Sequence, residues 1–152
     1  MKRTIIAILS IFLFIQITSC KKTIKVVEET YPDGSAKLER VYIEKENDKK
    51  ELLSETTYYS NKQKQSEGEF KNEKRHGKWT FWYSNGNKWS EGYFAEGLDD
   101  GERTMWYENG QVRIEGKYDK GKQVGIWKFW DEKGALIKEV DMVKFLKEGK
   151  EK

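Results

Sequence analysis

Hydrophobic and polar side chains alternate with a period of two along much of the chain. In the clearest stretch, Trp79, Phe81 and Tyr83 fall on one side of an extended backbone, whereas Thr80 and Trp82 fall on the other. Because large rings occupy both sides, the pattern predicts β-strands in a sheet whose two faces are both partly covered. We therefore expect an all-β fold.

The alternating segments belong to a repeat with a period of 24 residues. The sequence WYSNG at 82–86 recurs as WYENG at 106–110 and, degraded, as WDEKG at 130–134. Residues 58–62 form a weaker earlier copy, so the repeat extends over more than half of the chain. Four further columns keep the same spacing: Gly68, Gly92 and Gly116; Gly77, Gly101 and Gly125; Trp79, Arg103 and Trp127; Phe81, Met105 and Phe129.

Each repeat predicts one β-hairpin. The pairs Asn85-Gly86 and Asn109-Gly110 are strong signals for tight turns in which both central residues have positive φ. The return strand 88–94 is expected to end at Glu96-Gly97, and a second turn through 99–101 starts the next unit. Hairpins joined in series form an elongated, single-layer antiparallel meander.

The start of the chain has the pattern of an export signal, with a basic segment at 1–3 and an apolar run at 5–17. That run is shorter than the ~20 residues that a membrane-spanning helix needs.

The earliest and weakest copy of the repeat, at 31–34, fits the 24-residue spacing only with an insertion near 46–50. We expect a signal peptide at 1–19, a lipidated N-terminus and linker at 20–23, a repeat domain at 24–143 with clear repeats at about 55–142, and a C-terminal cap or tail at 144–152.

The segment Ile17-Thr18-Ser19-Cys20 resembles a bacterial lipobox. The resemblance implies a diacylglycerol on the Cys20 thiol, cleavage before Cys20, and palmitate-type acylation of the new amino terminus. Several acyl chains give stable membrane anchoring. Since no acidic residue follows Cys20, the resemblance also implies the cell envelope, and the outer membrane if the cell has one. The leaflet and the side, periplasmic or surface, stay open, and the alternative is a plain signal peptide with a chance cysteine.

Composition and charge narrow the classes of function. The chain has 29 basic and 26 acidic residues, and removing the signal with Lys2 and Arg3 leaves a net charge of +1. Such a balance argues against a nucleic-acid partner. The single Cys excludes an internal disulfide, and the single His excludes a histidine-based metal site. We expect no catalytic residues, no metal and no cofactor, and therefore no enzyme.

Residues 67–79 resemble the core of the MORN repeat, and 92–101 and 116–125 repeat it. The WYxNG element and the 24-residue step resemble the bacterial MORN repeat variant, which is common in proteins labelled YwqK-family toxin–antitoxin antitoxins. The resemblance implies an array of β-hairpins that binds or scaffolds another protein or an envelope component without catalysis. On this interpretation the chain is a membrane-anchored envelope lipoprotein. The alternative is an antitoxin-like regulator that neutralises a partner toxin protein, and the oligomeric state is undetermined.

Tryptophans are the candidate partner-binding residues. Trp82, Trp106 and Trp130 recur once per unit on one face, where they either form an aromatic ladder for a ligand or pack on one another in place of a core. We expect packing, with Trp106 in the core. Trp89 stands where the other units have Arg113 and Ile137, so it is either a contact residue specific to its repeat or a neutral variation.

Polar candidates have structural explanations in the sequence. His76 is expected in a turn with no marked catalytic partner. The acids at 96, 99 and 100 lack the spacing of a calcium-binding loop and are typical of turns. One carboxylate per unit lies in register, and lysines flank this row on neighbouring strands, so we expect a ladder of ion pairs rather than a catalytic acid and base. The row consists of Glu67, Glu91, Glu115 and Glu139.

Overall fold

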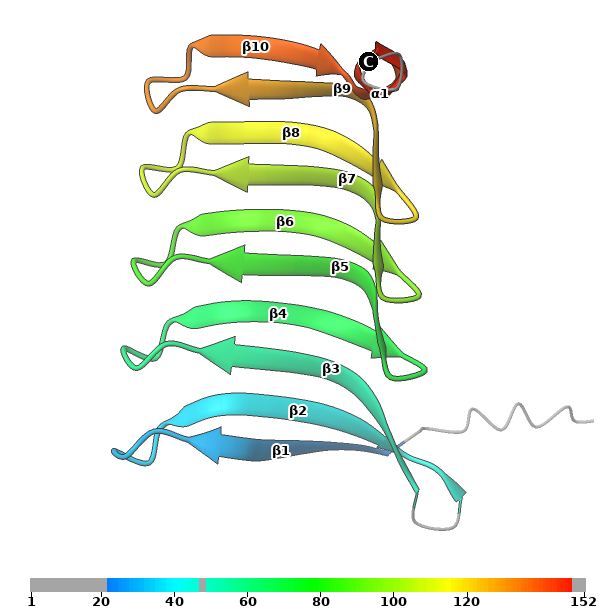
Figure 1. Cartoon of the computed structure of the whole chain (residues 1–152). Helices are drawn as coiled ribbons and strands as arrows, with labels where there is room; N and C mark the ends of the chain where they lie inside the picture. The colour runs from blue at the N-terminus through cyan, green and yellow to red at the C-terminus, as the bar shows by residue number, and fades with distance from the viewer. Residues whose placement is uncertain (1–21, 47–48, 149–152) are drawn as a thin grey trace, which may run out of the picture.

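The computed structural model describes residues 22–46 and 49–148. The expected signal peptide and Cys20 lie outside these residues. The described chain forms one ten-stranded sheet and one short helix (Figure 1). The elements are β1 (Thr23–Thr30), β2 (Ala36–Glu44), β3 (Lys50–Tyr58), β4 (Lys64–Lys71), β5 (Lys74–Trp82), β6 (Lys88–Ala95), β7 (Leu98–Trp106), β8 (Val112–Asp119), β9 (Lys122–Trp130), β10 (Leu136–Asp141) and α1 (Met142–Glu148).

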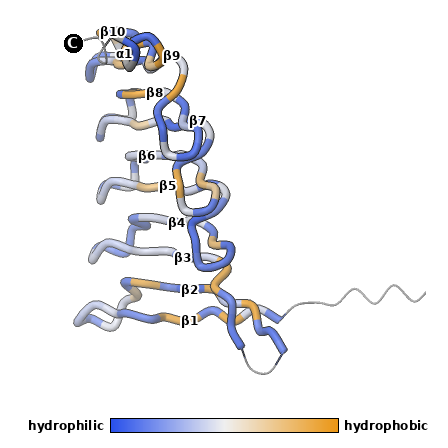
Figure 2. Tube along the Cα trace, turned by 45° about the vertical axis from the view of Figure 1, so that its right-hand side comes forward, coloured by the Kyte–Doolittle hydropathy of each residue, from blue (hydrophilic) through white to orange (hydrophobic). Residues whose placement is uncertain are grey.

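Every strand pairs with its neighbours in the sequence and runs antiparallel to them. Consecutive hairpins therefore stack in chain order from β1 to β10, and the expected single-layer meander is confirmed (Figure 1). Hydrophobic residues are spread along the whole stack, and no second layer of the described chain covers them (Figure 2). Within the described residues, no helix has the length and hydrophobicity that crossing a bilayer requires.

The sheet has two faces, which we call inner and outer. Register pairs place Gly68 opposite Trp79 and Ser66 opposite Phe81, and these four residues lie on the inner face. The inner face continues through the strands with Ser90, Gly92, Arg103, Met105, Ile114, Gly116, Trp127 and Phe129. The outer face carries the intervening residues, among them Glu67, Thr80, Glu91, Thr104, Glu115, Lys128 and Glu139.

The core lies on the inner face, where large side chains cover glycines. Trp79 is 0% exposed and Trp127 is 3% exposed, and each lies flat on the glycine of the strand before it, Gly68 or Gly116. A Cβ on either glycine would lie 2.1–2.2 Å from an indole carbon. Glycine is therefore required at these positions because the ring occupies the space of a side chain.

The sheet bends next to this core. Gly77 and Gly101 have positive φ (66° and 122°), and the strand register shifts beside them. Beyond the bend, Arg75 places its guanidinium 4.2 Å from the Trp79 ring centroid, and the Phe70 ring packs edge-on against the same indole at 5.4 Å. The ends of the hairpins thus fold toward the inner face and make it concave. Figure 1 shows the strands curving at the end opposite the Asn-Gly turns.

The turns differ from the sequence prediction. Tyr83 N–H donates to the Asn87 carbonyl (2.8 Å) and Gly86 N–H donates to the Tyr83 carbonyl (3.0 Å), and of the loop residues only Gly86 has positive φ. This geometry is a three-residue loop in which a type I turn precedes a left-handed glycine. The two-residue turns with positive φ at both centres lie at the other ends of the hairpins, at 72–73, 96–97 and 120–121.

Because of that placement, two assignments made from the sequence are wrong. Asp99, Asp100 and Gly101 lie inside β7 rather than in a turn, and His76 lies inside β5, opposite Glu69. Only two residues are needed between antiparallel strands whose twist matches the turn. The chain therefore reverses at Glu96-Gly97 and needs no second turn.

Two places in the array depart from a plain series of hairpins joined by tight turns. Residues 45–49 connect β2 to β3, where the other hairpins are joined by two-residue turns, and this is the region of the expected insertion. At the C-terminus, α1 begins at Met142, two residues before the expected cap. The Asp141 carboxylate caps it by accepting hydrogen bonds from Val143 N–H (2.9 Å) and Lys144 N–H (3.2 Å).

Candidate functional site

The column of Trp82, Trp106 and Trp130 is not the core. All three indoles are half-buried and lie on the outer face. Trp82 pairs with Lys88, whereas the equivalent partners of Trp106 and Trp130 are Val112 and Leu136. The expectation that these rings pack on one another, with Trp106 in the core, is therefore wrong.

Strand spacing explains this outcome. Equivalent residues of successive repeats are two strands apart, which is roughly 10 Å, whereas aromatic rings in contact have centroids within about 7 Å. A side chain of the intervening strand fills the gap. Lys64 Nζ lies 5.9 Å from the Trp82 ring centroid, and Lys88 Nζ lies 5.5 Å from that of Trp106. On the inner face the intervening residue is glycine, which lets Trp79 lie flat and become buried.

Three carboxylates of the outer-face row, Glu67, Glu91 and Glu139, have the lysine partners expected from the sequence, whereas Glu115 forms no ion pair within the described part of the chain. Lys64 Nζ lies 2.9 Å from a Glu67 carboxylate oxygen, and Lys88 Nζ lies 2.7 Å from one of Glu91. Lys78 approaches the other oxygen of Glu91 at 2.8 Å. Burial opposes ionisation of Glu91, but the hydrogen bonds from the two lysines outweigh it and lower the pKa of this carboxyl.

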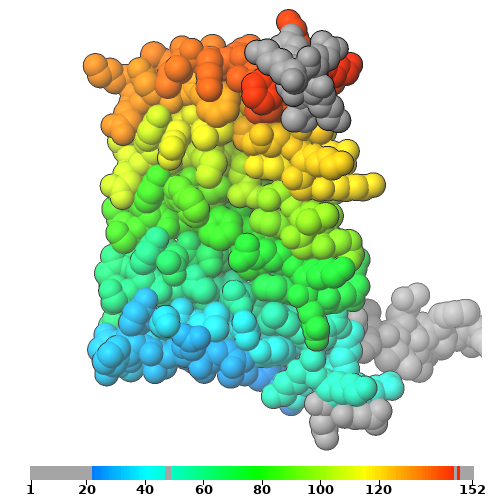
Figure 3. All heavy atoms as spheres, in the orientation of Figure 1, coloured from blue at the N-terminus to red at the C-terminus, as the bar shows by residue number. Residues whose placement is uncertain are grey.

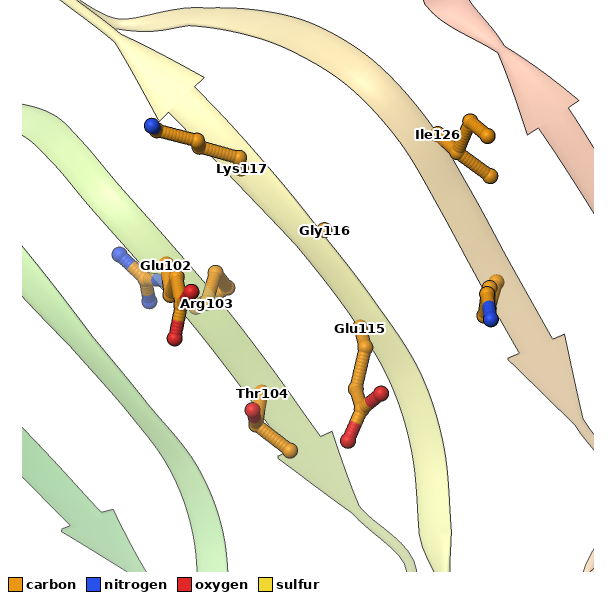
Figure 4. Close-up of a pocket in the computed structure, with 8 residues that line it drawn as sticks. Glu102, Arg103, Thr104, Glu115, Gly116, Lys117 and Ile126 are labelled. Carbon is orange, nitrogen blue, oxygen red and sulfur yellow. The ribbon is translucent and has the colours of Figure 1, made fainter.

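A shallow polar hollow of about 320 Å³ lies on the outer face of β7, β8 and β9 (Figure 4). Glu102, Thr104, Glu115, Lys117 and Ile126 lie side by side there. Acidic and basic groups alternate across the hollow and are open to solvent. Their arrangement defines no charge that a ligand would complement.

Trp89 lies on the opposite face from the other candidate tryptophans. It is the extra residue at a bulge in β6, where Phe81 pairs with Ser90 and Trp82 with Lys88. Its ring packs edge-on against Phe81 at 5.8 Å and stays 39% exposed. The four candidate tryptophans therefore do not form one site.

Trp89 borders an apolar hollow of about 250 Å³. Tyr59, Gln65, Phe81 and Trp82 also line it, together with the small residues Thr57 and Ser66. The hollow continues up the inner face as a band of half-buried apolar side chains. The band comprises Phe81, Met105, Ile114 and Phe129.

Cations stack on the rings of the inner face. Arg75 covers Trp79, and Arg113 lies 5.5 Å from the Tyr107 ring centroid. Lys138 lies 4.7 Å from that of Phe129. Sequence reasoning missed this set, because Arg75, Arg113 and Lys138 occupy three different positions of the repeat. The register of the strands brings Arg113 and Lys138 next to rings that precede them in the same hairpin. The bend at Gly77 brings Arg75 onto Trp79 of its own strand.

In the middle repeat, an ion pair replaces the cation and ring of the repeat before it. Asp99 and Arg103 stand at the positions of Arg75 and Trp79, and their side chains form an ion pair on the inner face. The Arg103 guanidinium also donates to Ser90 Oγ (3.2 Å) and lies 5.3 Å from the Phe94 ring centroid. Burial lowers the pKa of Arg103, and the positive charge of Arg75 acts in the same direction.

Tyrosines connect each hairpin to the next. Tyr59 Oη donates to the Trp82 carbonyl (2.8 Å), and Tyr83 and Tyr107 donate in the same way to the carbonyls of Trp106 and Trp130 (2.9 Å each). Asparagine side chains add parallel bonds between successive turns, such as Asn109 Nδ2 to the Glu132 carbonyl (2.8 Å). The joint between repeats is thus the same along the array.

The fold defines a β-hairpin repeat protein, and comparison with known families agrees. The MORN repeat variant family matches residues 53–72, 75–96 and 99–120. These matches coincide with the hairpins β3–β4, β5–β6 and β7–β8, so three hairpins of the array are similar to the MORN repeat variant. No curated protein matches the chain. MORN repeats in general are binding or scaffolding modules, and an open sheet with an apolar, cationic inner face is compatible with that role.

Proposed function

We propose that this chain is a non-catalytic binding module held at the cell envelope by lipid on Cys20. The observation that carries the proposal is the open inner face. Its aromatic and cationic side chains recur along the stack, and no second layer of the described chain covers them. Figure 3 shows side chains of consecutive hairpins forming one continuous surface. In most folds such a surface would be buried, whereas here it is available to a partner.

The composition of the inner face supports binding rather than solvation. Protein interfaces are enriched in Trp, Tyr, Phe, Met and Arg, and their strongest contacts are often Trp, Tyr and Arg. Trp89, Phe81, Met105 and Arg113 belong to these classes and lie on adjoining strands. By contrast, the outer face surrounds its half-buried tryptophans with rows of Glu, Thr and Lys, in which lysines and carboxylates pair with one another.

The position of the first strand fits an anchor close to the array. Since β1 begins at Thr23, three residues after Cys20, a lipid on Cys20 would hold the first hairpin within ~10 Å of its attachment point. The array would then present its partner surface next to the membrane rather than at the end of a long tether.

Fractionation and mass spectrometry test the anchor. We expect the protein purified from cells to begin at an acylated Cys20 and to be in the membrane fraction, and Cys20→Ala to release it. Lys22→Ala, next to the same junction, is the control and leaves the protein in the membrane. A soluble wild-type protein with unmodified Cys20 contradicts the anchor.

Crosslinking in intact cells tests the binding role. We expect Trp89→Ala to reduce partner crosslinking more than Trp130→Ala, because Trp89 lies on the open inner face and Trp130 lies on the outer face. Equal crosslinking by all forms contradicts the role of this face. Recovery of a toxin whose activity the chain suppresses would instead support the antitoxin-like regulator.

A further inference from the structure

Charge is distributed unequally between the two faces. On the outer face several lysines lie beside carboxylates, as for Lys64 with Glu67, Lys88 with Glu91 and Lys128 with Glu139. On the inner face, the carboxylates of Glu55 and Asp99 are already paired with Arg40 and Arg103. Other cations of the inner face contact aromatic rings rather than carboxylates.

Three of these cations are held in place by aromatic rings. Arg75 lies 4.2 Å from the Trp79 ring centroid, Arg113 lies 5.5 Å from that of Tyr107, and Lys138 lies 4.7 Å from that of Phe129. None of the three forms an ion pair within the described part of the chain. A stacked guanidinium keeps its N–H edge free in a fixed plane, which suits the two oxygens of a carboxylate.

Apolar surface lies between the cations. Arg75 lies 5.8 Å from the ring centroid of Phe81, which lines the hollow beside Trp89. Met105 and Ile114 continue the apolar band toward Lys138. From β5 to β10 the set spans five strand steps, or about 24 Å, which matches seven or eight residues of an extended peptide. The surface thus alternates positive and apolar points over the length of a short linear segment.

We propose that the inner face between β5 and β10 binds an extended acidic segment of a partner protein. Carboxylates of the segment pair with Arg75, Arg113 and Lys138, and its apolar side chains cover Phe81 and Trp89. The inference rests on the proposed role of the chain as a binding module and specifies its partner. An extended chain can enter the concave face, whereas the hairpin ends that fold toward it keep a flat bilayer away.

Fluorescence anisotropy with the purified protein and labelled peptides of about 12 residues tests the inference. The probe peptide alternates Glu and Leu at the positions that face one way along an extended chain. Two matched peptides carry Gln or Lys in place of Glu. We expect the Glu peptide to bind at least about tenfold more tightly than the Gln peptide and its binding to weaken with salt.

Paired variants locate the site. Arg113→Gln with Lys138→Gln removes two inner-face charges and leaves the Trp79 corner intact. Lys117→Gln with Lys128→Gln removes the same charge from the outer face of neighbouring strands. We expect the first pair to weaken binding of the Glu peptide about tenfold and the second less than about twofold, with equal melting temperatures. Arg75→Lys tests stacking, because it keeps the charge and loses the planar guanidinium.

Each other outcome overturns the inference. Equal weakening by both pairs of variants means that net charge alone attracts the peptide, and equal binding of the Glu and Gln peptides means that the cations have no role. Tighter binding to vesicles of anionic lipid, lost in the Arg113/Lys138 variant, would assign the face to a membrane. If a cellular partner is crosslinked equally by that variant and the wild type, the binding role stands and the acidic-segment inference is wrong.

Discussion

The indole of Trp79 lies flat on Gly68, its register partner on the neighbouring strand. A Cβ at position 68 would lie 2.1 Å from the ring, and Trp127 repeats the arrangement on Gly116 at 2.2 Å. The one fully buried ring of this hairpin thus depends on the absence of a side chain next to it.

Gly68→Ala is expected to destabilise the protein by about 3 kcal/mol or more, because the added methyl overlaps a ring that has no room to move. Urea unfolding measures the loss. Glu69→Ala, an exposed neighbour on the same strand, is the control and is expected to stay within about 0.5 kcal/mol of wild type. The overlap predicts that Gly68→Ala costs less stability in a Trp79→Leu background than in wild type. If the cost is the same in both backgrounds, the proposed overlap is absent.

The two tryptophan columns are expected to differ in stability effects. Trp79→Ala removes a ring that is 0% exposed and is expected to cost about 3–5 kcal/mol. Trp106→Ala removes a half-buried ring beside Lys88 and is expected to cost about 1–2 kcal/mol. Thermal melts compare the two, and Trp79→Phe provides a milder change if the alanine variant does not fold. A larger loss of stability for Trp106→Ala than for Trp79→Ala would contradict the assignment of the core to the inner face.

The Asn-Gly turns are expected to depend on one backbone angle. Gly110 has a φ of 83°, and a Cβ there would meet no atom within 4 Å, so only the backbone conformation resists substitution. Gly110→Val is expected to cost about 2 kcal/mol, and Gly110→Asn about 1 kcal/mol or less, since Asn tolerates this region. Lys62, at the equivalent position two repeats earlier, adopts a φ of 68°. Gln111→Ala is the control, and equal effects of all three changes would contradict the turn geometry.

The tyrosine joints are expected to contribute equally along the array. Tyr83→Phe and Tyr107→Phe each remove one hydrogen bond to a carbonyl of the next hairpin, and each is expected to cost about 1–1.5 kcal/mol. Tyr93 is 46% exposed and serves as the control, with no change expected for Tyr93→Phe. Denaturant unfolding distinguishes the variants. Costs near zero for the first two would show that water replaces the bond without loss.

Glu91 is expected to make part of the stability depend on acid pH. Hydrogen bonds from Lys78 and Lys88 lower the pKa of Glu91 below its ordinary value of 4.5, although burial opposes the shift. A lowered folded-state pKa stabilises the protein above pH 4.5 and loses that effect as the pH falls through the folded-state value. Glu91→Gln is therefore expected to lower stability at neutral pH and to flatten its decline below about pH 4.5.

Glu115→Gln is the matched control for this pH dependence. Glu115 occupies the same position one repeat later, where Val112 and Glu102 replace the two lysines that contact Glu91. Melting temperatures from neutral pH to about pH 3 are expected to follow wild type for this variant. A Glu91→Gln profile that also follows wild type would contradict the role of the lysines.

Much of the fold could be predicted from the sequence because its information is local and repeated. The alternation around Phe81 requires strands, and the recurring Asn-Gly pairs require reversals at fixed intervals. The open meander follows from these two facts alone. The exact turn class did not follow, because an Asn-Gly pair suits both a two-residue turn and a type I turn that ends in a left-handed glycine.

The core was assigned to the wrong column for a physical reason. A single-layer sheet has aromatic residues on both faces, so the alternation does not say which face is concave. The Trp106 column was assigned to the core because it has tryptophan in every repeat, whereas the Arg103 column does not. The decisive signal was the column of glycines. A glycine lies opposite each residue of the Arg103 column, Gly92 in this repeat, and it leaves room for a large side chain to lie over it. The cationic set on the inner face needed the register between adjacent strands, which the columns of the repeat do not give.

The identical tyrosine joints allow the length of this array to change in whole repeats. Because Tyr59, Tyr83 and Tyr107 make the same bond to the hairpin that follows, a whole unit of two strands can be added or removed without designing a new junction. Each such change alters the length of the concave face by roughly 10 Å. Among proteins built this way, the number of hairpins would then set the length of partner that the concave face can bind.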